Sequence, residues 1–318
     1  MSLTAIATQM EATTAKFHDK ELAKTGLEKN YFLSKLLAKA KETASGRSFT
    51  WRIKYAKSTT QWIGENEEQN TTPVEKITEV EVPYHQSSTP CYLSEFELQK
   101  NHGKERKLNL LSESLTMLRD DVADDLATQL ISGDGVKEPL GLETWVAEDP
   151  NVATPTLATI VRSERTWMQN QYKDLSAGLG AGLPDLETLK IACAHGNESV
   201  NAVLTSRAAY TYIYANLVGL QREPHTDAAK LGFTSFTWDG MPVTWSDEIE
   251  SAKSGGDSIY LLRLADWELN FMPGMRMKRT KWFKPERQRA IVCYMYNDCV
   301  LVCKKPWNQG VLHDVTGA

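Results

Sequence analysis

The segment from Leu108 to Leu130 carries the strongest regular pattern in this chain. Its apolar residues recur in steps of three and four, at Leu108, Leu111, Leu115, Leu118, Val122, Leu126 and Leu130. Such steps place the side chains on one face of an α-helix, which predicts a helix of about six turns. Gly133 and Gly135 are expected to end it. The opposite face carries acidic residues and is expected to meet solvent.

Before this helix, aromatic and aliphatic residues alternate with polar ones at Phe49, Trp51, Ile53 and Tyr55. Alternation predicts a β-strand with one apolar face. A second strand is predicted around residues 80–84, with residues 92–98 continuing in extended form. The polar stretch 57–76 between the strands contains the apolar pair Trp62 and Ile63. Because an isolated hairpin is marginal in water, we interpret this unit as an arm whose aromatic face rests on a neighbouring molecule; two strands of an ordinary sheet are the alternative.

The other segments complete a mixed pattern. Residues 2–45 are predicted to be helical and only loosely tied to a core, either as a hairpin or as an arm that packs on a neighbour. After Leu183 the pattern becomes α/β, and the predicted elements are a strand at 202–204, a helix at 206–217, a hairpin at 233–245, a strand at 259–262 and a hairpin at 290–304 that turns at Asn297-Asp298. This order predicts the α+β class.

Composition excludes several classes of protein. In 318 residues, 41% are hydrophobic and 24% are charged, which excludes bulk disorder. The net charge of −5 argues against a general binder of nucleic acid or anionic membranes. The chain shows no secretory signal, and its longest apolar run, 291–296, is too short to span a bilayer. Five cysteines, an odd number, suit a reducing compartment, so we expect a soluble cytosolic protein.

Two charged segments are candidate functional sites. Asp120, Asp121 and Asp124 have a spacing that resembles the diphosphate-Mg²⁺ motif of prenyl-diphosphate enzymes, but no second acidic motif accompanies them. The basic stretch 276–289, with Trp282 and Phe283, could stack single-stranded nucleic acid. We favour a solvated helix face for the first. For the second we favour ion pairs with a neighbouring element or subunit, such as the acidic helix.

The cysteines and histidines fit no catalytic or zinc-binding spacing. We therefore predict no catalytic residue, no metal ligand and no cofactor, and we expect the cysteines to be buried apolar side chains.

Taken in order, these elements resemble the major capsid proteins of tailed bacteriophages, which share the Hong Kong 97 coat fold. The resemblance covers most of the chain and rests on this layout and on local phrases at 45–47, 139–143, 167–171, 231–236, 238–243 and 309–312. It implies an N-terminal helical arm at 1–45, an E-loop at 46–100, a peripheral domain with a spine helix at 101–195, an axial domain at 196–284 and return strands of the peripheral domain at 285–318.

The resemblance also implies a function. It indicates a structural capsid protein that assembles into hexamers and pentamers of an icosahedral head around the phage genome. The implied partners are further copies of the chain, a separate scaffolding protein and a portal. The shell is expected to enclose double-stranded DNA without sequence-specific binding, and no contact with a membrane is expected. The expected location is the virion capsid, assembled in the host cytoplasm. An encapsulin-like nanocompartment shell is the main alternative; an Mg-diphosphate enzyme using the acidic helix is a weaker one.

Candidate contacts between subunits are Phe49, Trp51, Ile53, Tyr55, Trp62, Ile63, Arg276, Lys278 and Arg279. Some relatives also join a lysine to an asparagine with a nearby carboxylate as base. Lys54 or Lys57, with Asn308 and Asp314, could supply these groups here, although nothing in their spacing requires it.

Overall fold

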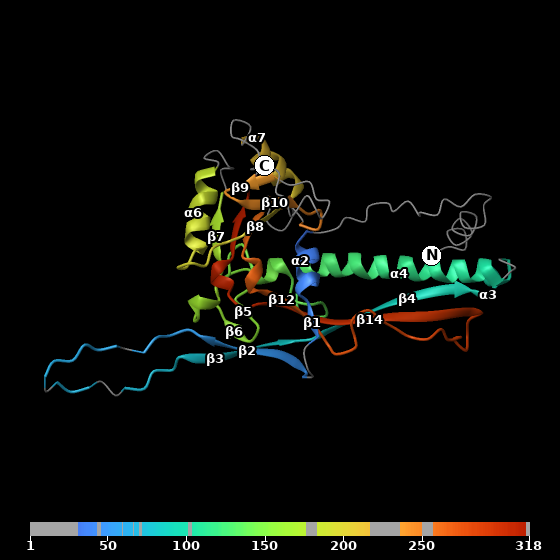
Figure 1. Ribbon diagram of the computed structural model, residues 1–318, viewed down its shortest axis with the longest axis horizontal. Coiled ribbons are helices and arrows are strands. Elements are labelled where there is room, and N and C mark those ends of the chain that lie inside the picture. Colours follow the sequence, from blue (N-terminus) through green and yellow to red (C-terminus); the bar gives the residue numbers. More distant parts are fainter. Residues whose placement is uncertain are drawn as a thin grey trace.

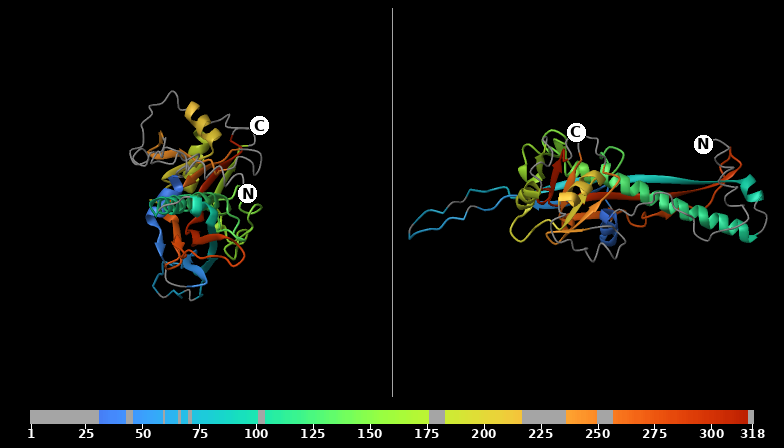
Figure 2. Two further views of the ribbon diagram at one scale, coloured as in Figure 1. Left: turned by 90° about the vertical axis from the view of Figure 1, so that its right-hand side faces the viewer. Right: turned by 90° about the horizontal axis from the view of Figure 1, so that it is seen from above.

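The computed structural model describes residues 31–42, 46–58, 60–65, 67–69, 72–100, 104–175, 183–216, 236–249 and 257–315. They form an elongated layer at one end, a compact α/β part at the other and a projecting hairpin (Figures 1 and 2). The helix predicted from Leu3, Ile6, Ala7 and Met10 lies outside the described residues. Of the helices that the structure describes, none is both long and apolar enough to cross a membrane.

The long strand β14 (Ala290–Cys303) organises the elongated layer. One edge pairs antiparallel with β4 (His85–Ser94), from Ala290 opposite Ser94 to Cys299 opposite His85. The other edge of β14 pairs antiparallel with β12 (Trp267–Phe271) and the short β13 (Lys278–Arg279). On its far side, β12 pairs in parallel with β1 (Lys41–Glu42). The predicted hairpin at 290–304 is therefore wrong. Asn297 and Asp298 suit a turn, but ladder partners on β4 hold them within a continuous strand, where they are 1% and 2% exposed.

The predicted long helix is confirmed as α4 (Lys104–Ser132), which runs alongside β4 and β14 (Figure 1). Its apolar stripe packs Leu118 and Val122 against Cys91, Cys293 and Met295 of the two strands. The helix ends at Ser132, where the sequence predicts. The returning chain passes so close to position 133 that only glycine fits there, since a Cβ at Gly133 would lie 2.0 Å from the carbonyl oxygen of Pro139.

A short helix, α3 (Glu95–Lys100), replaces the extended chain predicted through Phe96 and Leu98. Its start is of the capping-box type, in which the side chains of Ser94 and Glu97 each accept a backbone N–H of the first turn. The Ser94 hydroxyl accepts the Phe96 N–H at 3.3 Å, and the Glu97 carboxylate accepts the Ser94 N–H at 3.3 Å. These local bonds end the strand after Ser94.

The second sheet has six strands in the order β7-β15-β11-β8-β10-β9. In chain order these are β7 (Gln171–Asp174), β8 (Ala202–Thr205), β9 (Phe236–Trp238), β10 (Met241–Trp245), β11 (Ile259–Leu262) and β15 (Gly310–His313). Helices α6 (Leu183–Cys193) and α7 (Arg207–Asn216) pack against it. The strands predicted at 202–204 and 259–262, the hairpin predicted near 233–245 and the helix predicted at 206–217 are confirmed within the described residues.

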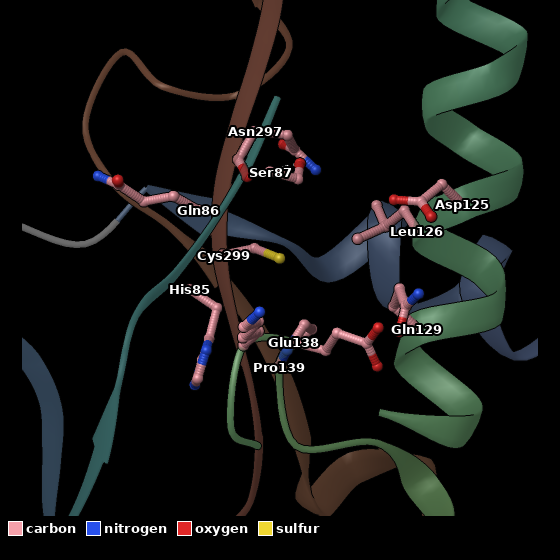
Figure 3. Close-up of a pocket in the computed structure, with 11 residues that line it drawn as sticks. His85, Gln86, Ser87, Asp125, Leu126, Gln129, Glu138, Pro139, Asn297 and Cys299 are labelled. Carbon is pink, nitrogen blue, oxygen red and sulfur yellow. Dashed lines mark hydrogen bonds between the residues drawn. The ribbon is translucent and has the colours of Figure 1, made fainter. Parts of the chain in front are cut away.

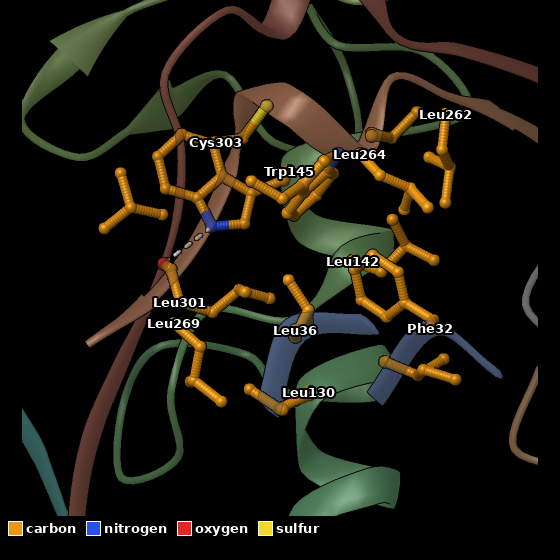
Figure 4. Close-up of a cluster of buried hydrophobic side chains, with 14 of the residues drawn as sticks. Phe32, Leu36, Leu130, Leu142, Trp145, Leu262, Leu264, Leu269, Leu301 and Cys303 are labelled. Atoms are coloured by element: carbon orange, nitrogen blue, oxygen red, sulfur yellow. Dashed lines mark hydrogen bonds between the residues drawn. The ribbon is translucent and has the colours of Figure 1, made fainter. Parts of the chain in front are cut away.

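The main core lies where the two sheets meet (Figure 4). The helix α5 (Leu142–Trp145) places the Trp145 indole there, fully buried, and its Nε1–H donates to the carbonyl oxygen of Leu301 at 3.2 Å. The segment predicted to be loosely tied also enters this core. In α2 (Tyr31–Lys39), Phe32 and Leu36 are each 1% exposed, and the Phe32 ring meets Trp267 edge-on at 5.3 Å. The prediction of loose attachment to the core is therefore wrong for the described part of this segment.

Leu130 on α4 tests this core directly, because it is 1% exposed (Figure 4). Removing a buried leucine side chain loses its transfer free energy and leaves a cavity, so Leu130→Ala is expected to lower the free energy of unfolding by about 3 kcal/mol. Urea unfolding of the dissociated chain measures this. Ile191→Ala, at a position 65% exposed on α6, is the matched control and should cost less than about 0.5 kcal/mol. Equal effects would contradict this placement of the core.

Candidate functional site

The hairpin of β2 (Ser48–Lys54) and β3 (Ile77–Pro83) forms an arm that extends well beyond the body of the molecule (Figures 1 and 2). The strands pair antiparallel from Ser48 opposite Pro83 to Lys54 opposite Ile77. The Tyr55 N–H still donates to the Lys76 carbonyl at 2.9 Å. Beyond this bond the described residues continue as an extended loop without strand pairing, which leaves a long tip.

The aromatic face of the arm packs on its own chain. Ile53 is 5% exposed, and Trp51 lies 6.2 Å from Trp145 between ring centroids. Tyr55 stacks on Trp167 at 5.6 Å. Phe49 is partly buried against the same core. The expectation that this face needs a neighbouring molecule is therefore wrong, because α5 and the turn at 166–168 already cover it. A role of these four residues in subunit contacts stays a prediction, but an uncovered aromatic face no longer supports it.

The tip of the arm carries two exposed apolar side chains. Trp62 is 95% exposed and Ile63 is 45% exposed. A tryptophan is a large apolar surface with one polar N–H, which is why such side chains concentrate at interfaces. The arrangement is suited to contact with another molecule at a distance from the core.

The basic stretch divides its charges among several partners. Lys284 and Arg289 pair with Glu95 on α3, and the hydrogen bond from Lys284 lowers the pKa of the Glu95 carboxyl. This confirms ion pairing with a neighbouring element for these two residues, but the element is α3 and not the acidic helix. Phe283 stacks on Tyr294 at 5.7 Å.

The three candidate contact residues of this stretch lie on or beside β13. The Arg276 guanidinium lies over the Phe271 ring at 5.3 Å. Lys278 and Arg279 are exposed opposite Tyr296 and Met295. Their role as contacts between subunits stays a prediction.

The acidic run lies on α4 as the helical pattern predicts. Partial burial and the neighbouring charge of Asp120 raise the pKa of Asp121. In the described part of the chain, no three-ligand group forms around these carboxylates. The five cysteines are all free and buried, which confirms the prediction that they act as apolar side chains.

A polar cavity of about 200 Å³ lies between α4, β4 and β14 (Figure 3). Three buried side-chain atoms beside it, His85 Nε2, Gln129 Oε1 and Asn297 Oδ1, have no hydrogen-bond partner among the described residues. Such a volume holds several water molecules, which satisfy buried polar groups of this kind. Sequence patterns could not find this cavity, because its lining comes from separate elements that only the fold brings together.

A polar network joins the two sheets at the turns where the chain crosses between them. Asn308, fully buried in the turn Pro306–Asn308, donates from Nδ2 to Glu198 at 2.9 Å and to Asp266 at 3.2 Å. Arg263 bonds Asp266 at 2.7 Å and pairs with Glu198 at 3.2 Å. Lys305 also bonds Glu198, and these hydrogen bonds, from Lys305 and Asn308, lower the pKa of the Glu198 carboxyl.

This network also bears on the possible lysine–asparagine cross-link. The Asn308 amide group is held inside its own chain by two carboxylates. Asp314, the carboxylate expected to act as base, instead lies 3.5 Å from His313. The structure therefore places Asn308 and Asp314 in separate clusters, which does not favour this chemistry.

Comparison with known proteins gives the family. The sequence matches the phage capsid family over residues 24–306. The chain belongs to the phage capsid family. No curated protein sequence matches it significantly. The family consists of structural capsid proteins, so this phage capsid protein is a component of a virion shell and not an enzyme.

Solved structures agree on the fold of this phage capsid protein. The capsid of cyanophage A-1(L) is 14% identical, with a TM-score of 0.72 over 95% of this chain and 97% of the other. The capsid of a native GTA particle is 14% identical, with a TM-score of 0.62 over 98% and 99%. The SrpI encapsulin of Synechococcus elongatus PCC 7942 is 14% identical, with a TM-score of 0.59 over 100% and 98%. The α+β class and the Hong Kong 97 type of fold are thus confirmed.

Glu198 gives the capsid protein a pH-dependent contribution to stability. Because the pKa of Glu198 is lower in the folded chain, this contribution is complete above the ordinary glutamate pKa of about 4.3 and disappears as the pH falls through the folded pKa. Glu198→Gln is expected to cost about 1 kcal/mol at pH 7, a modest value because the side chain is 32% exposed.

Urea midpoints of the dissociated chain at pH 7 and pH 3 measure the difference in stability between the wild type and Glu198→Gln. The variant should approach the wild type at the lower pH. Glu286→Gln, at an exposed position, should match the wild type at both. A Glu198→Gln deficit that is equally large at both pH values would contradict the assignment.

Proposed function

We propose that this chain is the major head protein of a tailed phage and that it assembles into the hexamers and pentamers of an icosahedral shell. Membership of the phage capsid family supports self-assembly into a shell. The single observation that carries the proposed mode of contact is the exposed tip of the arm, with Trp62 at 95% exposure. The tip of each arm contacts a neighbouring subunit and buries this apolar surface.

The placement of the arm suits such contacts. Its base is held rigidly, because the aromatic face of β2 is fixed on α5 and the turn at 166–168. A rigid base directs the tip away from the core and lowers the entropy lost when the tip binds. Contacts of one surface on a different surface of the next copy are heterologous, and they close into rings when the rotation between copies allows it.

We also propose a division into functional regions that follows the sheets. The E-loop is the hairpin at 46–84, since β4 leaves it to pair with β14. The peripheral domain contains α3, α4, β4 and the sheet around β14. The axial domain is the six-stranded sheet, which includes β7 and β15 from outside the range 196–284 expected from the sequence. The described part of the N-terminal segment joins the core through α2.

Further partners follow from this proposal. A separate scaffolding protein directs assembly in the host cytoplasm, a portal occupies one vertex, and the shell encloses double-stranded DNA without reading its sequence. The net charge of −5 supports enclosure without tight binding.

An encapsulin-like compartment is the second candidate, because the likeness to the SrpI encapsulin extends over the full chain. The contents of particles isolated from the native source distinguish the two. Double-stranded DNA supports the phage head, whereas an enclosed enzyme in particles without DNA supports the compartment.

Trp62→Ser tests the proposed contact. Loss of a central aromatic anchor costs about 2 kcal/mol or more per contact, so the concentration needed for assembly is expected to rise at least about tenfold. Light scattering and sedimentation velocity across a concentration series measure this threshold.

Trp62→Phe, which keeps an aromatic ring, is the matched control and should retain most of the assembly. The urea midpoint of the dissociated chain should be unchanged in both variants, because the tip lies outside the core. Assembly of Trp62→Ser at the wild-type threshold would overturn the proposed contact.

A further inference from the structure

The adjacent ends of β7 and β15 bring three potential metal ligands together. Parallel pairing of the two strands sets His313 opposite Asp174, and Asp314 follows directly. One ligand atom from each of these side chains lies within 4.8 Å of the others. We propose that Asp174, His313 and Asp314 form a binding site for a divalent transition-metal ion of the zinc type, a property that goes beyond the proposed function.

The imidazole of His313 is the observation that points to a ligand. The residue is 9% exposed, and its Nδ1 has no hydrogen-bond partner among the described residues. This nitrogen lies 3.5 Å from Asp314 Oδ2 and 3.9 Å from Asp174 Oδ1. Hydrogen bonds of this kind measure about 2.7–3.2 Å, so both separations are too long for one.

These separations fit coordination better than hydrogen bonding. Ligand atoms at about 2.0–2.1 Å from a tetrahedral zinc ion lie about 3.3–3.4 Å from one another. Small side-chain rotations would bring the three atoms to that spacing. Coordination would also give the buried Nδ1 the partner that it lacks, and a buried polar atom without one is costly.

The backbone arranges these side chains on one side of the sheet. Successive residues of a regular strand point to opposite faces, but Asp314 has a φ of 56°, in the left-handed region. This conformation breaks the alternation and turns the carboxylate toward His313. Aspartate is among the few residue types that adopt it readily. Neighbouring bonds hold the segment, since the Leu175 N–H donates to the His313 carbonyl at 3.1 Å and the Val315 N–H to the Asp257 carbonyl at 3.0 Å.

The charge around the site also favours a cation. Within the described ranges, no lysine or arginine lies at ion-pair distance from Asp174 or Asp314, and the nearby Lys173 pairs with Asp185 instead. Two adjacent carboxylates repel each other until a positive charge joins them. One imidazole with two carboxylates suits zinc and similar ions, whereas Ca²⁺ and Mg²⁺ prefer oxygen ligands alone.

The metal would link strands that are distant in the sequence. β7 is one of the two edge strands of the six-stranded sheet, and β15 is its neighbour, about 140 positions later in the sequence. The Asp174 side chain is 52% exposed, which gives an ion access from solvent. Coordination across the two strands would stabilise this edge and raise the thermal stability of the protein, since a ligand that binds only the folded state stabilises it.

Calorimetric titration of the chelator-treated full-length chain with ZnCl₂ tests the site. We expect zinc binding that is lost in Asp174→Asn and in Asp314→Asn. Asparagine tolerates the left-handed backbone at position 314, so both variants should fold. Loss of a group that merely supports a metal ligand costs about 10- to 100-fold in affinity, and loss of a ligand should cost at least as much. Zinc should raise the melting temperature of the wild type and not that of the variants.

Asp247→Asn is the matched control, because Asp247 is an exposed carboxylate paired with Arg207 elsewhere. It should bind zinc as the wild type does. Equal zinc affinity in the wild type and Asp174→Asn would overturn the site, as would no zinc binding to the wild type. Binding of Ca²⁺ or Mg²⁺ more tightly than zinc would overturn the assigned metal class. Because the titration needs no assembly, its failure leaves the proposed shell function standing.

Discussion

The backbone of β14 has to be hydrogen-bonded along its length, and this requirement organises the molecule. β4 bonds one edge of the strand over residues 290–299, and β12 and β13 bond the other edge. At about 3.3 Å per residue the strand extends about 46 Å, similar to the length of about 43 Å expected for α4. The helix can therefore cover the β4–β14 ladder from end to end. The same pairing fixes the start of the arm, because β3 leads directly into β4.

The polar network around Asn308 fixes the compact part relative to this layer. The chain crosses between the sheets at Leu264–Asp266 and at Pro306–Asn308. The Asn308 amide joins the two crossings, because it donates to Asp266 as well as to Glu198. Gln309 adds to this, since its Oε1 accepts the Arg263 N–H at 2.9 Å and the Trp267 indole N–H at 3.1 Å. Buried polar groups that are mutually bonded favour one geometry over others. The arm is thus mounted on a body whose two halves have a defined orientation.

Sequence patterns could predict the elements that local periodicity determines. The leucine stripe of α4, the alternation in β2 and the short apolar strand β8 each follow from spacing alone. Prediction was wrong at Asn297-Asp298, because pairing with a strand about 200 positions away outweighs the local preference for a turn. It was also wrong about the aromatic face of β2, since the covering residues Trp145 and Trp167 lie far along the chain. The cluster at His313 depends on strand pairing and on one left-handed backbone, neither of which is visible in spacing.

In the proposed shell the arm links copies of the chain, and the two sheets support the base of the arm. In the proposed mode of assembly, each chain packs the aromatic face of β2 against its own body, and the tip with Trp62 contacts a neighbouring copy. Electron cryomicroscopy of particles formed by the expressed chain, with its scaffold where one is needed, tests this most directly. We expect a closed icosahedral shell in which the tip of each arm lies on an adjacent subunit. Arms that fold back onto their own subunit, or a chain that stays monomeric under all conditions, would contradict it.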